Sequence, residues 1–148
     1  MVNTFLPFPD YSEVARALDN KRLGKQRVET LQILKANLGL TKGWVNHPAA
    51  VMWRGSEGEL VTYGLTIIKE WRNRGFVDLL VEVQMKELMK SLPGCTFKEP
   101  WWLKNELFHQ SHQSNLKRKD PLHYNFDVPD DLPYLWPMPD GTMRITKK

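Results

Sequence analysis

A helix with almost no apolar face is the feature of this sequence that most constrains its fold. The segment from Asn105 to Tyr124 has no Gly or Pro before Asp120-Pro121, so a helix is predicted over residues 105–118. Helical spacing places one apolar and four polar side chains on the same face: Phe108, Ser111, His112, Asn115 and Lys119. Packing such a face against the protein costs free energy unless each polar group finds a partner. The segment therefore indicates the wall of a polar site; the alternative is a solvated amphipathic helix with two incidental histidines.

Length and composition limit the class of protein. With 148 residues the chain can form one domain with its own core, so we expect a single helical domain over residues 1–148. The single cysteine, Cys95, excludes an internal disulfide and is typical of a reducing cytoplasm. No apolar run reaches the length of a membrane span, and residues 1–10 lack a signal-peptide pattern. We expect a cytoplasmic monomer with no membrane partner.

The apolar periodicity predicts an all-α fold, a small helical bundle. Helices are expected over residues 12–20, 21–38, 56–74 and 78–92, with a further short helix after residue 46 and the polar helix as the last. The expected caps are Ser12, Asn46, Ser56 and Asp78. In the helix after Asp78, the side chains expected to point inward are Leu79, Leu80, Val83 and Leu92.

The C-terminal segment, residues 125–148, is expected to be an irregular tail. Its four prolines disfavour regular structure. Tyr134, Leu135 and Trp136 are large enough to anchor it, so we expect it to wrap the helices rather than to form a domain.

The distribution of cations predicts an anionic partner. The net charge is only +4, but five cations lie between Arg16 and Arg27 and three more at Lys117–Lys119. Lys21, Arg22 and Lys25 fall in the first turns of a predicted helix, where the helix dipole disfavours cations. A phosphate bound at that end would offset this cost. DNA is therefore the predicted partner, and a solvated surface is the alternative.

Two aromatic and histidine-containing groups are candidates for a site. Trp53 beside Arg54 fits a pair that stacks on a base and holds its phosphate, although a core role for Trp53 fits equally well. His109 and His112 are three residues apart and could share a metal ion with His47 or His123. Because no cysteine or paired carboxylate accompanies them, we expect no metal and no cofactor. Proton transfer or phosphate binding is the preferred role for these histidines.

Three motifs occur in an order typical of one family. Gly43–Pro48 (Gly-Trp-Val-Asn-His-Pro) is similar to a Gly-Tyr-x-Asn-His-Pro motif, and Lys119–Tyr124 is similar to Arg-Asp-Pro-x-x-Tyr. More weakly, Pro9–Tyr11 and Gln26–Val28 resemble the first arm and the catalytic helix of the same family. That family is the pyrimidine-dimer DNA glycosylases of the endonuclease V type. The resemblance spans residues 4–124 and is strongest to a divergent bacterial and phage branch.

The resemblance implies a small helical fold, DNA as substrate, and removal of a damaged or modified base. In the family, an N-terminal α-amine attacks the sugar C1′ and forms a Schiff base, and a Glu at the start of the catalytic helix takes part. Residues 19–24 contain no Glu, and the family's Glu falls on Lys21 or Leu23. Val2 is small enough for Met1 to be removed, so the α-amine and Lys21 are both candidate nucleophiles.

The predicted site combines these residues. The catalytic candidates, expected to converge on one concave surface, are Lys21, His47, His109 and His112. The candidates for DNA binding are Arg16, Arg22, Lys25, Arg27, Trp53, Arg54 and Lys119, with Trp53 filling the gap left by a flipped base. Two alternatives stay open: a non-catalytic DNA-binding protein on the same scaffold, and an enzyme that processes a free nucleotide or modified base.

Overall fold

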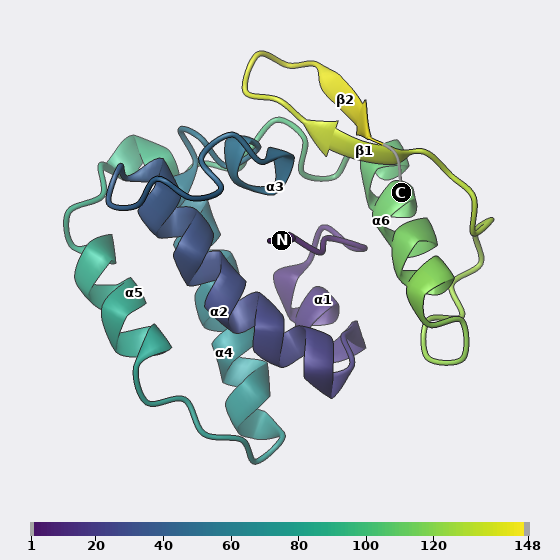
Figure 1. The fold of residues 1–148 in the computed structure, drawn as a ribbon, viewed down its shortest axis with the longest axis horizontal. Helices are drawn as coiled ribbons and strands as arrows, with labels where there is room; N and C mark the ends of the chain where they lie inside the picture. Colours follow the sequence, from purple (N-terminus) through teal and green to yellow (C-terminus); the bar gives the residue numbers. More distant parts are fainter. Residues whose placement is uncertain (1, 147–148) are drawn as a thin grey trace.

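Helices make up most of the structure, and their order follows the predicted one. The computed structural model describes residues 2–146 (Figure 1). In chain order its elements are α1 (Tyr11–Ala17), α2 (Asn20–Asn37), α3 (Pro48–Val51), α4 (Glu57–Asn73), α5 (Val81–Met89), the 3-10 helix η1 (Gly94–Phe97), α6 (Glu106–Lys119), β1 (Tyr134–Pro137) and β2 (Met143–Thr146). The helix predicted from the polar segment is confirmed as α6.

Local hydrogen bonds set the starts of the helices and correct two predicted caps. α1 is capped by Asp10, whose Oδ1 accepts from the backbone N–H of Ser12 at 2.8 Å, rather than by Ser12 itself. α3 begins after His47, whose Nδ1 accepts from the N–H of Ala49 at 3.1 Å, rather than after Asn46. In each case the preceding side chain reaches N–H groups that the first helical turn leaves free.

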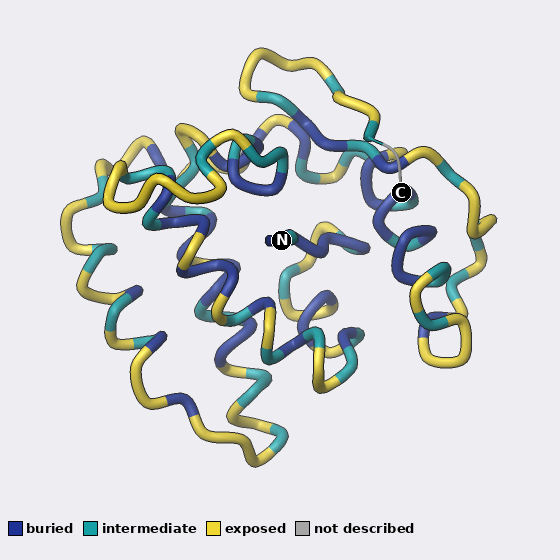
Figure 2. Tube along the Cα trace, in the orientation of Figure 1, coloured by how far each residue is buried: buried dark blue, intermediate teal, exposed yellow. Residues whose placement is uncertain are grey.

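α2 and α4 pack closely because glycines remove side chains from their contact. A Cβ at Gly64 of α4 would lie 2.8 Å from Cγ2 of Thr30 on α2, and one at Gly24 would lie 2.8 Å from the ring of Trp71. The buried side chains around this contact form a continuous cluster that extends from Val2 to Trp136 (Figure 2). Within residues 2–146, no helix combines the length and the apolar character needed to cross a membrane.

The start of α5 is held by charge rather than by the predicted apolar face. Leu79, Leu80 and Val83 were expected inside but are 76, 67 and 64% exposed. Asp78 is buried instead, and its carboxylate pairs with Arg27 of α2. A buried ion pair therefore fixes the α4–α5 connection to α2.

The C-terminal segment corrects the all-α prediction. β1 and β2 form an antiparallel hairpin in which Leu135 pairs with Ile145. The prolines did not exclude it, because Pro137 is the last residue of β1, where a missing N–H is tolerated. Tyr134 and Trp136 are buried as predicted, whereas Leu135 is only half-buried.

Candidate active site

An extended N-terminal arm, residues 2–7, lies between α6 and the other helices (Figure 1). Side chains, rather than a neighbouring strand, bind its backbone. Gln26 of α2 accepts from the N–H of Phe5 at 2.9 Å and donates to the C=O of Asn3 at 2.8 Å. The hydroxyl of Tyr63 on α4 donates to the C=O of Phe5 at 2.6 Å. These bonds bring the first described residue, Val2, against the middle of α2, where it is 1% exposed.

Glu29 of α2 meets the arm at this point. It is only 8% exposed and lies one turn after Lys25 and two turns after Lys21 on the same face of the helix. Glu29 is not among the residues predicted from the sequence, because the resemblance places the family's Glu within residues 19–24. The four-residue spacing of Lys21, Lys25 and Glu29 is the signal that could identify it.

Two adjoining pockets share Lys25 and Glu29. One has a volume of about 280 Å³ and is lined by Val2, Lys25, Val28, Glu29, Gln32 and Trp44. The other has a volume of about 160 Å³ and is lined by Asn3, Phe5, Lys21, Arg22, Lys25, Glu29 and Lys119. The carboxylate therefore stands where the arm, an aromatic rim and a group of cations meet.

Burial controls the protonation of this site. Desolvation raises the pKa of Glu29, although the nearby charge of Lys25 and a hydrogen bond from the Asn3 backbone act in the opposite direction. Desolvation likewise lowers the pKa of Lys119, helped by the charge of Arg22. A carboxyl with a raised pKa, facing several cations in a pocket, is typical of groups that transfer protons.

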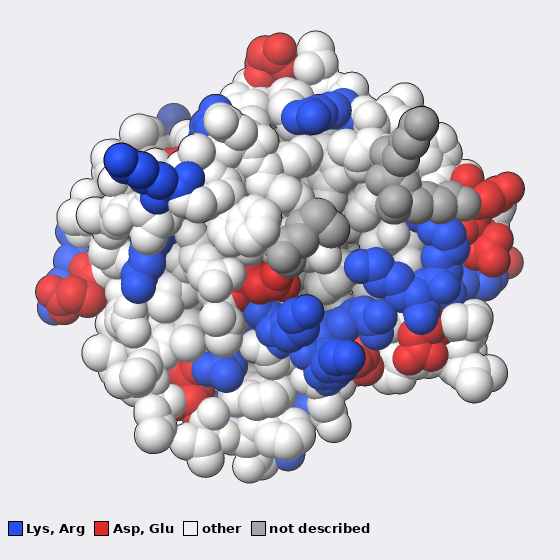
Figure 3. All heavy atoms as spheres, viewed as in Figure 1, with Lys and Arg blue, Asp and Glu red and all other residues white. Residues whose placement is uncertain are grey.

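The cations around Glu29 belong to a larger basic surface. On the face drawn in Figure 3, Lys and Arg side chains gather in a band that runs from the start of α2 toward α6. Of the predicted DNA-binding residues, Arg22, Lys25 and Lys119 line the pocket, together with the predicted nucleophile Lys21. Lys21 and Lys25 are exposed, and Arg22 is half-buried and paired with Asp19 at 3.2 Å.

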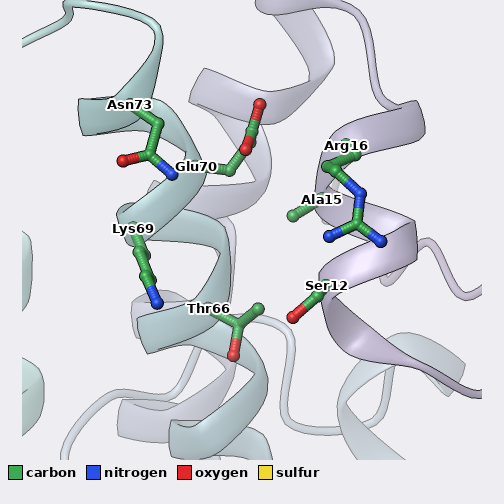
Figure 4. Close-up of a pocket in the computed structure, with 7 residues that line it drawn as sticks. All are labelled: Ser12, Ala15, Arg16, Thr66, Lys69, Glu70 and Asn73. Atoms are coloured by element: carbon green, nitrogen blue, oxygen red, sulfur yellow. The ribbon is translucent and has the colours of Figure 1, made fainter.

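The other predicted cations lie away from this pocket or are engaged elsewhere. Arg27 pairs with Asp78 and lies over the ring of Trp71, with Cζ 5.1 Å from the ring centroid. Arg54 donates to the backbone C=O of Val45. Arg16 lines a separate hollow between α1 and α4, with Lys69 and Glu70 among the other residues that line it (Figure 4). The cluster Lys117–Arg118 donates to backbone carbonyls of the C-terminal segment.

The candidate for base stacking changes from Trp53, which is buried, to Trp44, which is exposed. Trp53 is fully buried, and its Nε1 donates to Oγ1 of Thr4 at 3.2 Å, so it is not placed to enter DNA. Trp44, from the same sequence region, is 43% exposed and lines the pocket that contains Glu29. Its φ of 65° lies in the left-handed region, a strained conformation for a bulky residue that is often found at functional sites.

The predicted histidines do not join Lys21, since none of them lines either pocket. His112 is fully buried, and its Nδ1 accepts from the N–H of Leu6 at 3.1 Å. His109 is also buried and bonds to the C=O of Leu6 through Nδ1 at 2.7 Å. His47 caps α3. All three bind backbone groups, so the proton-transfer role predicted for them is not carried into the function proposed below.

The polar face of α6 is neither an open site wall nor a wet face. Ser111 accepts from the N–H of Leu135 at 2.7 Å, and Ser114 accepts from the N–H of Leu132 at 3.0 Å. Gln113 donates to the C=O of Pro7 at 2.7 Å. This helix replaces the missing apolar stripe with side chains that bind the backbone of the arm and of the C-terminal segment.

Comparison with known families supports an assignment. The sequence model described as pyrimidine dimer DNA glycosylase matches residues 2–79. This match covers more than half of the chain and includes the arm, Glu29, Trp44 and helices α1–α4. Comparisons with curated proteins and with solved structures gave no match. The chain belongs to the pyrimidine dimer DNA glycosylase family.

Proposed function

We propose that this protein is a DNA glycosylase with lyase activity, which removes a damaged or modified base from DNA. The observation that carries this proposal is Glu29, a buried carboxylate beside the N-terminal arm and a group of cations. Family membership favours pyrimidine dimers as the first substrate to test.

Glu29 would serve the proton transfers of this reaction. In the family's chemistry an amine attacks C1′, the bond to the base breaks, and a Schiff base forms before strand scission by β-elimination. The amine must lose a proton, the departing base gains one, and elimination removes one from C2′. A carboxyl whose pKa is raised by burial is suited to both giving and taking protons near neutral pH.

Two of the amines that border these pockets are candidate nucleophiles. Lys21 lines the smaller pocket with Glu29. If the mature chain begins at Val2, its α-amine belongs to the larger pocket, which Glu29 also lines. Met1 lies outside the described residues. The α-amine agrees with the family's chemistry, and we propose it as the nucleophile.

DNA binding would use the remaining residues of the two pockets. Arg22, Lys25 and Lys119 would bind phosphates, since together they form the basic wall of the smaller pocket. Trp44 would stack on an extruded base, since its ring is exposed at the rim of the larger one.

Borohydride trapping tests the proposal. Incubation with duplex DNA that carries an abasic site, in the presence of borohydride, should join the protein covalently to the DNA. Mass analysis of the trapped peptide then separates an adduct on the Val2 nitrogen from one on Lys21. Glu29→Gln should lower strand cleavage at a pyrimidine dimer by about 10²-fold or more, the usual contribution of general acid–base catalysis.

Glu59→Gln is the matched control. Glu59 is half-buried and accepts from the hydroxyl of Tyr11 at 2.9 Å, outside both pockets. The Glu59→Gln variant should leave strand cleavage unchanged. DNA binding without trapping or cleavage would instead support the non-catalytic DNA-binding protein, and equal effects of the two substitutions would remove Glu29 from the reaction.

A further inference from the structure

Two histidines of opposite tautomer bind one residue of the N-terminal arm, Leu6. His112 Nδ1 accepts from the N–H of Leu6, so the proton of this neutral ring is on Nε2. His109 Nε2 accepts from the N–H of Lys104 at 3.0 Å, so its proton is on Nδ1 and is donated to the C=O of Leu6. Both backbone groups of Leu6 are thus bound by α6.

These bonds control the register of the arm. An extended segment in an apolar groove can slip by one residue, which moves its end by about 3.5 Å. Directional hydrogen bonds prevent this, because a slipped arm would leave buried donors and acceptors without partners. Gln26 adds two such bonds on the opposite side of the arm, to Phe5 and Asn3.

The register of the arm determines which of its residues lie beside Glu29. Leu6 is four residues from Val2, and the intervening backbone forms no helix or turn. Asn3 lines the smaller pocket with Glu29, and Val2 lines the larger pocket with it. A shift of the arm by one residue would replace both contacts.

We infer that His109 and His112 are positioning residues: they lock the arm at Leu6 so that the N-terminal end of the chain faces Glu29. The inference rests on the proposed function for its catalytic consequence, but the locking itself is independent of any reaction. It gives α6, which lies outside the matched residues 2–79, a part in a site formed within them.

Three variants separate positioning from packing. His112→Leu keeps the bulk of the side chain and loses the acceptor for Leu6. His112→Asn restores an acceptor near the position of Nδ1. Ser111→Ala is the matched control, because Ser111 lies on the same face of α6 and binds the N–H of Leu135 rather than the arm.

Three measurements follow for each variant: amide exchange at Leu6, titration of the Glu29 carboxyl by carbon NMR, and the rate of borohydride trapping at saturating DNA. His112→Leu should speed exchange at Leu6 by at least about 10²-fold relative to amides of α4. It should also shift the titration of Glu29 toward that of an exposed Glu, and slow trapping at least tenfold with DNA affinity unchanged. His112→Asn should recover all three, and Ser111→Ala should alter none.

The inference is overturned if His112→Leu and Ser111→Ala act alike, or if the Glu29 titration stays unchanged when Leu6 opens. Where His112→Leu does not fold, Gln26→Met removes the bonds on the other side of the arm and is measured in the same way. Absence of trapping by the native protein would contradict the proposed function alone. Amide exchange at Leu6 and the titration of Glu29 would still decide whether the histidines position the arm.

Discussion

The outward face of α2 and the inward face of α6 are both polar, and the sequence predicts that they form one site. The structure separates them by what their side chains touch. On α6, the serines and histidines bind backbone groups of the arm and of the C-terminal segment. On α2, Lys21 and Lys25 have no carboxylate partner within ion-pair distance in the described part of the chain, and they line a pocket with Glu29.

This difference shows how a scaffold and a site can have the same composition. A polar group that is buried and satisfied by the protein's own backbone has no capacity left for a substrate. A cation without a partner beside a desolvated carboxylate has that capacity. The predictions below test this distinction, beginning with two cations on opposite faces of α2.

Arg27→Ala should have the largest effect, and the effect should be on stability. Removing Arg27 leaves the carboxylate of Asp78 buried without its main partner, which costs about 3–5 kcal/mol. Lys25→Ala, two residues away on the open face, should leave the stability within about 0.5 kcal/mol of the native value. Denaturant titration of both variants measures this, and similar losses would contradict the separation of the two faces.

His112 should make the protein sensitive to acid. Burial, reinforced by the charge of His109, lowers the pKa of His112 to about 3, against 6.5 for the free side chain. The folded state therefore disfavours the protonated form. The corresponding stability is fully present above pH 6.5 and is lost as the pH falls from 6.5 toward 3.

His112→Asn tests this prediction, because it removes the titrating group and keeps an acceptor for Leu6. Its melting temperature should fall less steeply between pH 6.5 and pH 4 than that of the native protein. His123→Asn, which alters an exposed ring, is the control. Parallel curves for His112→Asn and the native protein would show that His112 does not contribute to acid unfolding.

The cations that line the smaller pocket, from α2 and from the end of α6, should govern DNA affinity. Lys25→Ala and Lys119→Ala should each reduce the slope of log affinity against log salt by about 1, as expected when one phosphate contact is lost. The double variant should bind about tenfold or more weakly at low salt, across all sequences. Arg16→Ala, which alters the hollow between α1 and α4, should leave the slope nearly unchanged. An equal loss of slope in Arg16→Ala would extend the DNA surface to α1.

Trp44 should contribute to binding through its exposed ring. Trp44→Ala should weaken binding to a lesion-containing duplex by about 1–3 kcal/mol, the range for loss of one stacked base, and Trp44→Phe should retain most of it. Trp101→Ala is a matched control, because Trp101 is 44% exposed compared with 43% for Trp44 and lies outside both pockets. Equal losses at the two positions would show that the effect is not specific to the pocket.

The sequence predicted the helices well because apolar periodicity and helix-ending glycines are local signals. α2 ends at Asn37 before Gly39, which adopts a φ of 77°, as a left-handed residue after a helix should. The hairpin is not predicted, because the prolines disfavour strands in general, whereas Pro137 lies at the end of a strand. Apolar periodicity also predicts that Leu79 and Leu80 are buried in the core. They are exposed, because the ion pair of the buried Asp78 with Arg27 orients this segment.

The site was harder to predict because partners distant in sequence decide which polar residues are free. Nothing near His112 indicates that the N–H of Leu6, 106 positions away, will occupy its Nδ1. Nor does the sequence around Trp53 reveal that Thr4 binds its ring nitrogen and that Trp44 remains outside. Charge clustering is easier to read, since cations close in sequence on one helix share a surface: Lys21, Arg22 and Lys25 line one pocket. Even so, Arg16 and Arg27 of the same cluster lie elsewhere.

Glu29→Gln should have a small effect on stability, opposite in sign to its effect on catalysis. Because burial raises the pKa of Glu29, the folded state disfavours its ionised form. The protonated carboxyl therefore stabilises the fold below the unfolded pKa of 4.5, and this contribution is lost as the pH rises through the higher folded pKa. At pH 7 the neutral amide removes that cost, so the melting temperature should rise above that of the native protein. At pH 4 the native protein and the variant should melt at the same temperature.

Glu59→Gln, the control, should show no such rise of the melting temperature at pH 7. A lower melting temperature for Glu29→Gln would mean that Glu29 is a structural partner of Lys25 and the arm. Glu29 would then belong with the α6 side chains that bind the protein's own backbone rather than with the open face of α2.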